Sequence, residues 1–110
     1  MIKQLTPAAL AFFSVAAFAA PHIRLSAHPT PREVFAGDRL REAVEHLPGD
    51  ERILLATRLD PILKPYDKKI PGFGPDAKEA FLLRRLGNTI VVAGYDPSGV
   101  LYGALELADR

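Results

Sequence analysis

The sequence predicts an α+β fold, a two-layer sandwich in which two helices cover one face of a small, mostly antiparallel sheet. Apolar residues recur with helical spacing in two segments, 30–47 and 96–108. Short apolar runs occupy 52–57, 80–86 and 89–95, as buried strands require. Hydrophobic residues make up 48% of the chain and charged residues 25%, a balance typical of folded rather than disordered proteins. The expected order of elements is β-α-β-loop-β-β-α.

The length, charge and cysteine content exclude several classes of function. A chain of 110 residues is too short to contain a (β/α)₈ barrel enzyme, which needs about 250 residues. Lys and Arg number 14 against 13 Asp and Glu, so the extended basic field of a nucleic-acid-binding protein is missing. Because the sequence has no Cys, a disulfide scaffold, a cysteine-ligated zinc site and a thiol nucleophile are excluded.

A secretory signal peptide is predicted over residues 1–19. Lys3 supplies the positive start, residues 5–20 are almost all apolar, and Ala17-Phe18-Ala19 matches the small-residue cleavage pattern. A membrane-spanning helix needs about 20 apolar residues, more than this run provides. We therefore expect a secreted or periplasmic protein, without membrane attachment after cleavage, whose mature domain is residues 20–110.

Four strands are expected in the mature domain. Residues 23–26 alternate apolar and polar side chains, and residues 52–57 form an apolar run between turn residues. The runs 80–86 and 89–95 flank Gly87-Asn88, which predicts a β-hairpin with Gly87 first in a type II′ turn.

The first helix is expected to begin within Thr30-Pro31-Arg32-Glu33, which has a capping Thr, a Pro suited to the first turn and a Glu at the capping-box position. Gly37 weakens the helical pattern, so Asp38 is an alternative start. The expected apolar face consists of Leu40, Ala43, Val44 and Leu47. Pro48-Gly49 is expected to end the helix.

The second helix is expected to begin after Asp96-Pro97-Ser98-Gly99, with Asp96 as the capping residue. Its apolar stripe is Val100, Leu101, Ala104, Leu105 and Ala108. Gly103 costs a helix about 1 kcal/mol relative to Ala, and close approach to the sheet would compensate for this cost. The helical pattern continues to Arg110.

The segment Arg58–Pro75 is expected to be an irregular, solvated connector. It contains four prolines and two glycines, a density that disfavours any regular element. Lys64, Lys68 and Lys69 surround Tyr66, a combination that can bind an anionic sugar or a nucleic-acid strand. Gly72-Phe73-Gly74-Pro75 lacks the Gly-Lys-Ser/Thr of a phosphate-binding loop and is interpreted as a turn.

No constellation of catalytic or metal-ligating residues stands out in the sequence. The histidines and carboxylates considered are His22, His28, His46, Asp76, Glu79, Asp96 and Glu106. The histidines lack metal-ligand spacing, and sequence spacing does not place two carboxylates across a cleft as glycosidases require. Ser26 and Ser98 lack a nucleophile-elbow motif, and the positions of Tyr95 and Tyr102 favour packing over sugar stacking. The sequence therefore assigns no catalytic, cofactor-binding or metal-ligating residue.

The segments Ala80–Arg85, Thr89–Gly94 and Asp96–Leu107 carry a family resemblance. A strand pair is followed by a D-x-x-G-x-x-Y-G turn and helix, here Asp96, Gly99, Tyr102 and Gly103. This resembles the closing part of the non-catalytic N-terminal domain of α-glucuronidases and bacterial β-N-acetylhexosaminidases. The family often has Arg where this chain has Ser98. Gly99 would permit the tight turn.

The resemblance implies an exported accessory domain of a glycoside hydrolase, which packs against a catalytic (β/α)₈ barrel that this chain lacks and has no activity alone. On this hypothesis the chain is a fragment of a larger enzyme, or one shortened by its gene model. The alternative is a free-standing secreted module that binds a glycan or a protein through 58–75. A small hydrolase using Asp76 or Glu106 is the third reading. No cofactor is expected, and carbohydrate is a candidate partner whereas nucleic acid is not.

Overall fold

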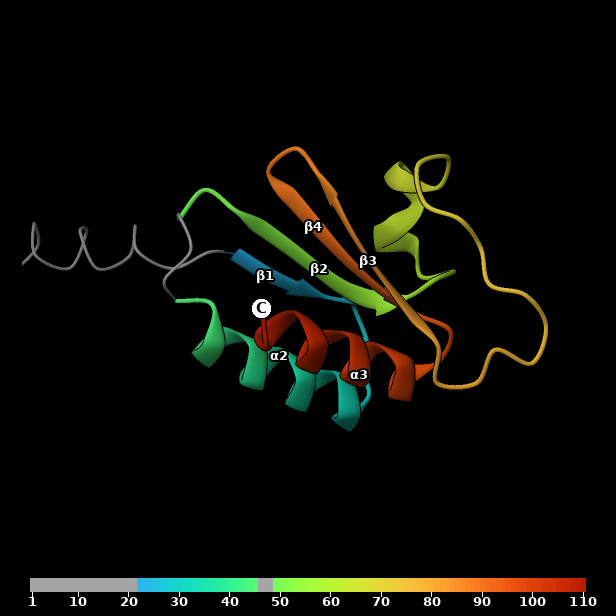
Figure 1. Cartoon of the computed structure of the whole chain (residues 1–110), viewed down its shortest axis with the longest axis horizontal. Helices are drawn as coiled ribbons and strands as arrows, with labels where there is room; N and C mark the ends of the chain where they lie inside the picture. Colours follow the sequence, from blue (N-terminus) through green and yellow to red (C-terminus); the bar gives the residue numbers. More distant parts are fainter. Residues whose placement is uncertain (1–21, 46–48) are drawn as a thin grey trace, which may run out of the picture.

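One mixed sheet of four strands organises the computed structural model, which describes residues 22–45 and 49–110 (Figure 1). The strands are β1 (His22–Leu25), β2 (Arg52–Thr57), β3 (Phe81–Leu86) and β4 (Thr89–Gly94), in the spatial order β1-β2-β4-β3. Two α-helices, α2 (Pro31–Ala43) and α3 (Pro97–Ala108), lie side by side on one face. The predicted α+β class, element order and placement of the two helices are confirmed.

The pairing of the strands differs from the mostly antiparallel sheet that was expected. β1 pairs with β2, and β2 with β4, in parallel, so only the β3–β4 hairpin is antiparallel. The first parallel pair follows from α2, because a helix that crosses the sheet returns the chain in its original direction. The second arises because β4, not β3, inserts beside β2, which leaves β3 at the edge.

The β3–β4 hairpin has the predicted two-residue turn. Leu86 is the partner of Thr89 across the turn, so Gly87 and Asn88 form the connection. Gly87 has a φ of 65°, a conformation that glycine adopts without steric cost. Asn88 is not among the residues with positive φ, a pattern that agrees with type II′.

The capping box predicted for the first helix is formed. The hydroxyl of Thr30 accepts a hydrogen bond from the Glu33 N–H at 3.3 Å, and the Glu33 carboxylate accepts one from the Thr30 N–H at 2.8 Å. α2 therefore begins at Pro31 rather than Asp38. Gly37 lies inside α2 where the helix packs closely on β1. A Cβ at this position would lie 3.3 Å from the side chain of Leu25, so the absence of a side chain favours the close packing.

The helix α2 ends at Ala43, before the predicted stop at Pro48-Gly49. Leu40 and Val44 are buried as expected. The predictions for His46, Leu47 and Pro48 fall outside the described residues.

The second helix begins as predicted, with a carboxylate oxygen of Asp96 accepting a hydrogen bond from the Gly99 N–H at 2.8 Å. Val100 and Ala104 are buried, whereas Leu105 is 37% exposed, so the buried stripe is narrower than the apolar pattern. The helix ends at Ala108, not at Arg110, and the Asp109 N–H donates back to the Leu105 carbonyl at 3.1 Å.

Three glycines bring α3 and the sheet into close contact. A Cβ at Gly103 would lie 2.8 Å from the Val92 side chain, which confirms the predicted close approach. A Cβ at Gly94 would lie 2.3 Å from the backbone nitrogen of Val100. The role expected for Gly99 is corrected: its φ is not positive, and its Cβ position lies 2.2 Å from the Ala80 carbonyl oxygen. Gly99 is thus required for backbone packing rather than for a tight turn.

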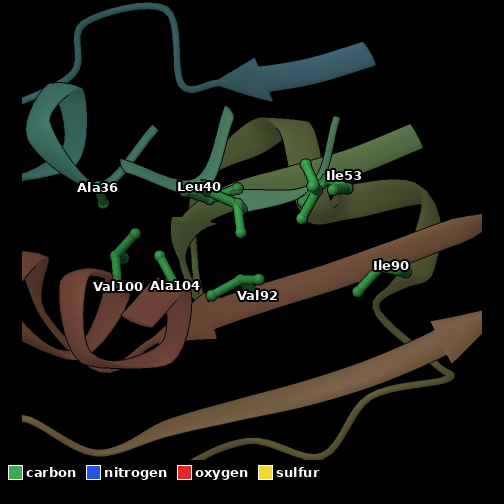
Figure 2. Packing of buried hydrophobic residues seen from close by; sticks show 9 residues of the cluster. Ala36, Leu40, Ile53, Ile90, Val92, Val100 and Ala104 are labelled. Atoms are coloured by element: carbon green, nitrogen blue, oxygen red, sulfur yellow. The ribbon is translucent and has the colours of Figure 1, made fainter. Parts of the chain in front are cut away.

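The main hydrophobic core lies between the helices and the sheet. Figure 2 shows side chains of α2, α3, β2 and β4 pointing toward one another in this layer. The buried cluster comprises Ala36, Leu40, Val44, Ile53, Leu55, Ile90, Val92, Val100 and Ala104. Because strand residues alternate faces, the even-numbered residues of β2 and the odd-numbered residues of β4 point to the opposite side.

The opposite face is covered by the segment that was expected to be an irregular, solvated connector. Residues Pro61–Tyr66 form a 3₁₀ helix, η1, in which Leu63 is fully buried, and Ile70 beyond it is only 4% exposed. The carboxylate of Asp60 accepts a hydrogen bond from the Ile62 N–H at 3.0 Å. Proline has no backbone N–H to donate. The prolines of η1 are tolerated because the N–H groups of other residues, such as Leu63 and Asp67, donate the backbone hydrogen bonds here. A second core therefore forms from Leu54, Ala56, Leu63, Ile70, Val91 and Ala93.

Candidate functional site

Two of the carboxylates considered for catalysis, Asp96 and Glu106, lie at opposite ends of α3 and do not form a pair. One oxygen of Asp96 accepts the Gly99 N–H, and the other accepts the Glu79 N–H at 3.2 Å. Glu106 lies ten residues further along α3, a rise of about 15 Å, and contacts Arg110 at 3.2 Å. That separation exceeds the spacing of about 5–10 Å between glycosidase carboxylates. Asp96 therefore joins the start of α3 to the loop before β3.

Of the remaining candidates, Glu79 lies beside Asp96, to which its N–H donates. Asp76 and Glu79 are turn residues with φ of 57° and 63°. His28 is exposed in the loop before α2. Ser98 is buried and accepts a hydrogen bond from Arg32 of α2, which joins the first turns of the two helices. Within residues 22–45 and 49–110, no three His, Asp or Glu side chains gather as metal ligands would.

Among the helices that the structure describes, none has the length and apolar character needed to cross a membrane.

A groove lies at the carboxyl ends of β2 and β4. It encloses about 590 Å³, and we call it the loop-end groove. It is lined by Thr57, Arg58, Leu59, Asp67, Gly72, Phe73, Tyr95, Asp96 and Pro97. In Figure 1 the chain leaves β2 toward η1 on one face and leaves β4 toward α3 on the other. The lining of the groove includes the residues that directly follow these strands, Arg58 and Tyr95, so the groove lies where the two connections diverge. Open α/β sheets bind ligands at such points.

The charged side chains of the loop-end groove, Arg58, Asp67 and Asp96, are engaged in internal contacts. Arg58, whose side chain is 12% exposed, donates to the carbonyl oxygens of Asp67, Ile70 and Pro71 and to the Asp67 carboxylate at 2.8 Å. The Arg58 hydrogen bond and charge hold the pKa of Asp67 below its ordinary value of 3.8. Arg58 thus ties the loop to the end of β2, a function that the sequence reasoning missed.

The loop-end groove exposes two large apolar side chains beside the exposed carboxylate of Asp67. Leu59 is 90% exposed, and Tyr95 is 42% exposed. The ring of Tyr95 meets that of Phe73 edge to face, with centroids 6.1 Å apart and planes at 84°. Tyr95 therefore packs on the Phe73 ring of the loop, yet remains half accessible.

A second groove lies on the sheet beside η1, and we call it the cationic groove. It encloses about 370 Å³ and is lined by His22, Arg24, Arg52, Leu54, Ile62, Pro65 and Tyr66. His22 is the β1 partner of Arg52 in the parallel register, and Arg24 lies two residues further along the same face of β1. The groove thus combines basic side chains of two adjacent strands with the apolar and aromatic residues of η1.

The lysines predicted to surround Tyr66 do not line this groove. Lys64, Lys68 and Lys69 are exposed on η1 and the loop after it. The basic residues that do accompany Tyr66 were missed, because they are brought together only by the pairing of β1 with β2, which the sequence did not indicate. The alternation of residues 22–25 was a usable signal for a polar face on β1, but it did not indicate which strand lies next to it.

The chain is similar to part of a known enzyme, although no protein-family model and no curated protein matches it. Among solved structures it is similar to a GH138 enzyme targeting pectin rhamnogalacturonan II, with 27% sequence identity and a TM-score of 0.57. The similarity covers 80% of this chain but only 9% of the enzyme. This chain therefore resembles a small part of a glycoside hydrolase, and the likeness supports a glycoside-hydrolase-related domain.

Proposed function

We propose that this chain is an exported accessory domain of a carbohydrate-active enzyme, and that it packs against a catalytic (β/α)₈ barrel. The observation that carries the proposal is the likeness to a glycoside hydrolase of which the chain matches only 9%. An enzyme of that size has ample further chain for the catalytic site. The finer hypothesis, an N-terminal domain of the α-glucuronidase or bacterial β-N-acetylhexosaminidase type with a signal peptide at 1–19, rests on the sequence motif.

A non-catalytic role agrees with the use of the carboxylates. Both oxygens of Asp96 accept backbone hydrogen bonds, and Glu106 is paired at the far end of α3. Hydrolysis of a glycosidic bond requires one carboxyl group to donate a proton and a second to act as nucleophile or base. These two groups are too far apart to act together in that way.

The loop-end groove is the surface that we assign to the barrel. The polar groups of Arg58 and Asp96 are satisfied within the domain, so covering them leaves few unpaired charges. Leu59 and Tyr95 would be withdrawn from water. The helices also expose apolar side chains, Val34, Phe35, Tyr102 and Leu105, but none of these is as exposed as Leu59, and α2 carries exposed ion pairs such as Arg41–Asp38 at 3.0 Å.

The first test is to read the DNA beyond the codon for Arg110 and the adjacent genes, which should encode a strand–helix series of barrel type. That barrel, produced separately, should bind this chain, and hydrolytic activity should reside in the barrel alone.

Leu59→Glu should weaken binding of the barrel about tenfold or more by placing a charge in the interface. The matched control Leu105→Glu alters an exposed apolar residue of α3 and should have less than a twofold effect.

Two results would contradict this proposal. Equal effects of the two substitutions would remove the loop-end groove as the docking surface. The absence of any barrel-encoding sequence would favour the alternative, a free-standing secreted binding module, which the cationic groove supports.

A further inference from the structure

We infer that the cationic groove binds an oligosaccharide that carries carboxylate groups, that is, one containing uronic acid residues. The inference rests on the proposed role in carbohydrate chemistry. It concerns a site separate from the loop-end groove, since the two share no lining residue.

The charge of the groove comes from the register of two strands. His22 and Arg52 are Cα partners, and Arg24 follows on the same face of β1. All three residues are exposed. The overall charge of the chain is only +1, so this concentration of basic groups is local rather than part of a basic protein surface.

Arg24 and Arg52 differ from Arg58 and Arg85 in having no carboxylate partner among the described residues, a property that they share with Arg32 and Arg84. Arg58 and Arg85 are each held by a carboxylate, at 2.8 Å from Asp67 and 2.9 Å from Glu51. Over the described ranges 22–45 and 49–110, no ion pair includes Arg24 or Arg52. A guanidinium group presents two parallel N–H donors that match a carboxylate. These two side chains are therefore available to a ligand carboxylate.

The walls of the groove favour a sugar over a simple anion. Tyr66, Pro65 and Ile62 of η1 line the groove together with the basic side chains and with Leu54 of β2. Small-ligand sites combine apolar walls with a few convergent polar groups, as this groove does. The C–H face of a sugar ring can pack on Tyr66 while its carboxylate meets an arginine, whereas inorganic phosphate would leave the apolar wall unused.

The position of the groove favours a chain of sugars over a single one. β1 is an edge strand of the sheet, so within the described part of the chain no further strand closes the groove on that side. A volume of about 370 Å³ is at the lower end of the range for small-ligand sites, which extends from about 300 to 1,000 Å³. An oligosaccharide can therefore occupy the groove and continue past the edge of the sheet.

The test is calorimetric titration of the purified chain with a galacturonic acid oligomer, a galactose oligomer of equal length, inorganic phosphate and a hexaglutamate peptide. We expect saturable binding of the uronate oligomer and at least tenfold weaker binding of the other three. Arg24→Ala and Arg52→Ala should each weaken uronate binding about fivefold to tenfold, as loss of a charge-assisted hydrogen bond does. Tyr66→Leu should also weaken it, and Tyr66→Phe should retain it.

The matched control is the double substitution Lys68→Ala and Lys69→Ala, which removes two positive charges near the groove but not from it. It should change binding less than twofold, against a loss of about 25-fold or more for Arg24→Ala with Arg52→Ala. Three outcomes would overturn the inference. The two double variants could lose affinity for the uronate oligomer equally, phosphate or hexaglutamate could bind as tightly as the uronate oligomer, or the uronate oligomer could fail to bind. The thermal midpoint should be unchanged in the arginine variants, because both side chains are exposed. Since the titration uses this chain alone, its outcome is independent of the barrel-docking experiment.

Discussion

The two faces of the sheet are covered by different means. On one face, α2 and α3 pack through small and aliphatic residues, with glycine at the points of closest approach (Figures 1 and 2). On the other, η1 and the following loop supply Leu63 and Ile70, and Arg58 holds the loop in place by hydrogen bonds. The helix side is stabilised by regular packing, whereas the loop side depends on a few anchoring residues.

This difference has a consequence for function. The helices extend over the sheet, whereas the short η1 leaves Arg24 and Arg52 of the β1–β2 region exposed. The loop also forms one wall of the loop-end groove through Phe73 and Gly72. Both candidate binding surfaces therefore border the loop-covered side, where irregular structure leaves polar and apolar side chains accessible.

The largest effect is expected on the helix side, from Gly99→Ala. The added Cβ would lie 2.2 Å from the Ala80 carbonyl oxygen, and backbone atoms cannot move aside without separating α3 from the sheet. We expect a loss of about 4 kcal/mol or more in the free energy of unfolding, measured by urea denaturation. The control Gly72→Ala has no atom within 4 Å of the added Cβ and should change stability by less than about 0.5 kcal/mol. Equal effects of the two substitutions would contradict the close packing of α3.

An intermediate effect is expected on the loop side, from Leu63→Ala. Leu63 is fully buried beneath η1, so its truncation leaves a cavity and should cost about 2–4 kcal/mol. The substitution should increase the rate of hydrogen exchange more in residues 58–75 than in α2 and α3, because it removes the side chain that anchors this segment to the sheet. Leu59→Ala is the control, because Leu59 is 90% exposed and its truncation should be nearly neutral. A uniform increase in exchange would show that the two sides unfold together.

The smallest effect concerns the Arg58–Asp67 contact at acid pH. Because the folded-state pKa of Asp67 is lowered, its contribution to stability is present above the ordinary value of 3.8 and is lost as the pH falls through the lower folded value. Asp67→Asn should therefore reduce the thermal midpoint at pH 7 slightly and reduce the loss of stability on acidification. Asp38→Asn, which removes a carboxylate from the exposed surface of α2, serves as the control. If Asp67→Asn and the unmodified chain lost stability equally on acidification, the lowered pKa of Asp67 would be contradicted.

The parts of the fold that follow from local chemistry were predictable. Thr30 with Glu33, Asp96 before Pro97, and Gly87-Asn88 each specify a structure over three or four residues, and each prediction is confirmed. The parallel partners of β2 were not predictable, because the pairing depends on where the hairpin inserts into the sheet. η1 was missed for a similar reason. The prolines disfavour a helix locally, but burial of Leu63 and Ile70 on the sheet stabilises the segment.

The candidate sites were less predictable than the fold. The sequence directed attention to Lys64, Lys68 and Lys69 because they are adjacent to Tyr66 along the chain. The residues that share a groove with Tyr66 are instead His22, Arg24 and Arg52, which come from strands before the loop. Similarly, nothing around Arg58 in the sequence indicates that its guanidinium group binds backbone carbonyls up to thirteen residues away.

By itself, the sequence determined the α+β class, the element order, the caps of both helices and the need for close packing at Gly103, because each depends on spacing or on neighbouring residues. Only the tertiary structure decided the parallel register of β1, β2 and β4, the burial of η1, and the grouping of arginines with Tyr66. The physical reason is that these features arise from contacts between segments distant in the chain. Such contacts are selected by the total surface buried, which no local pattern encodes.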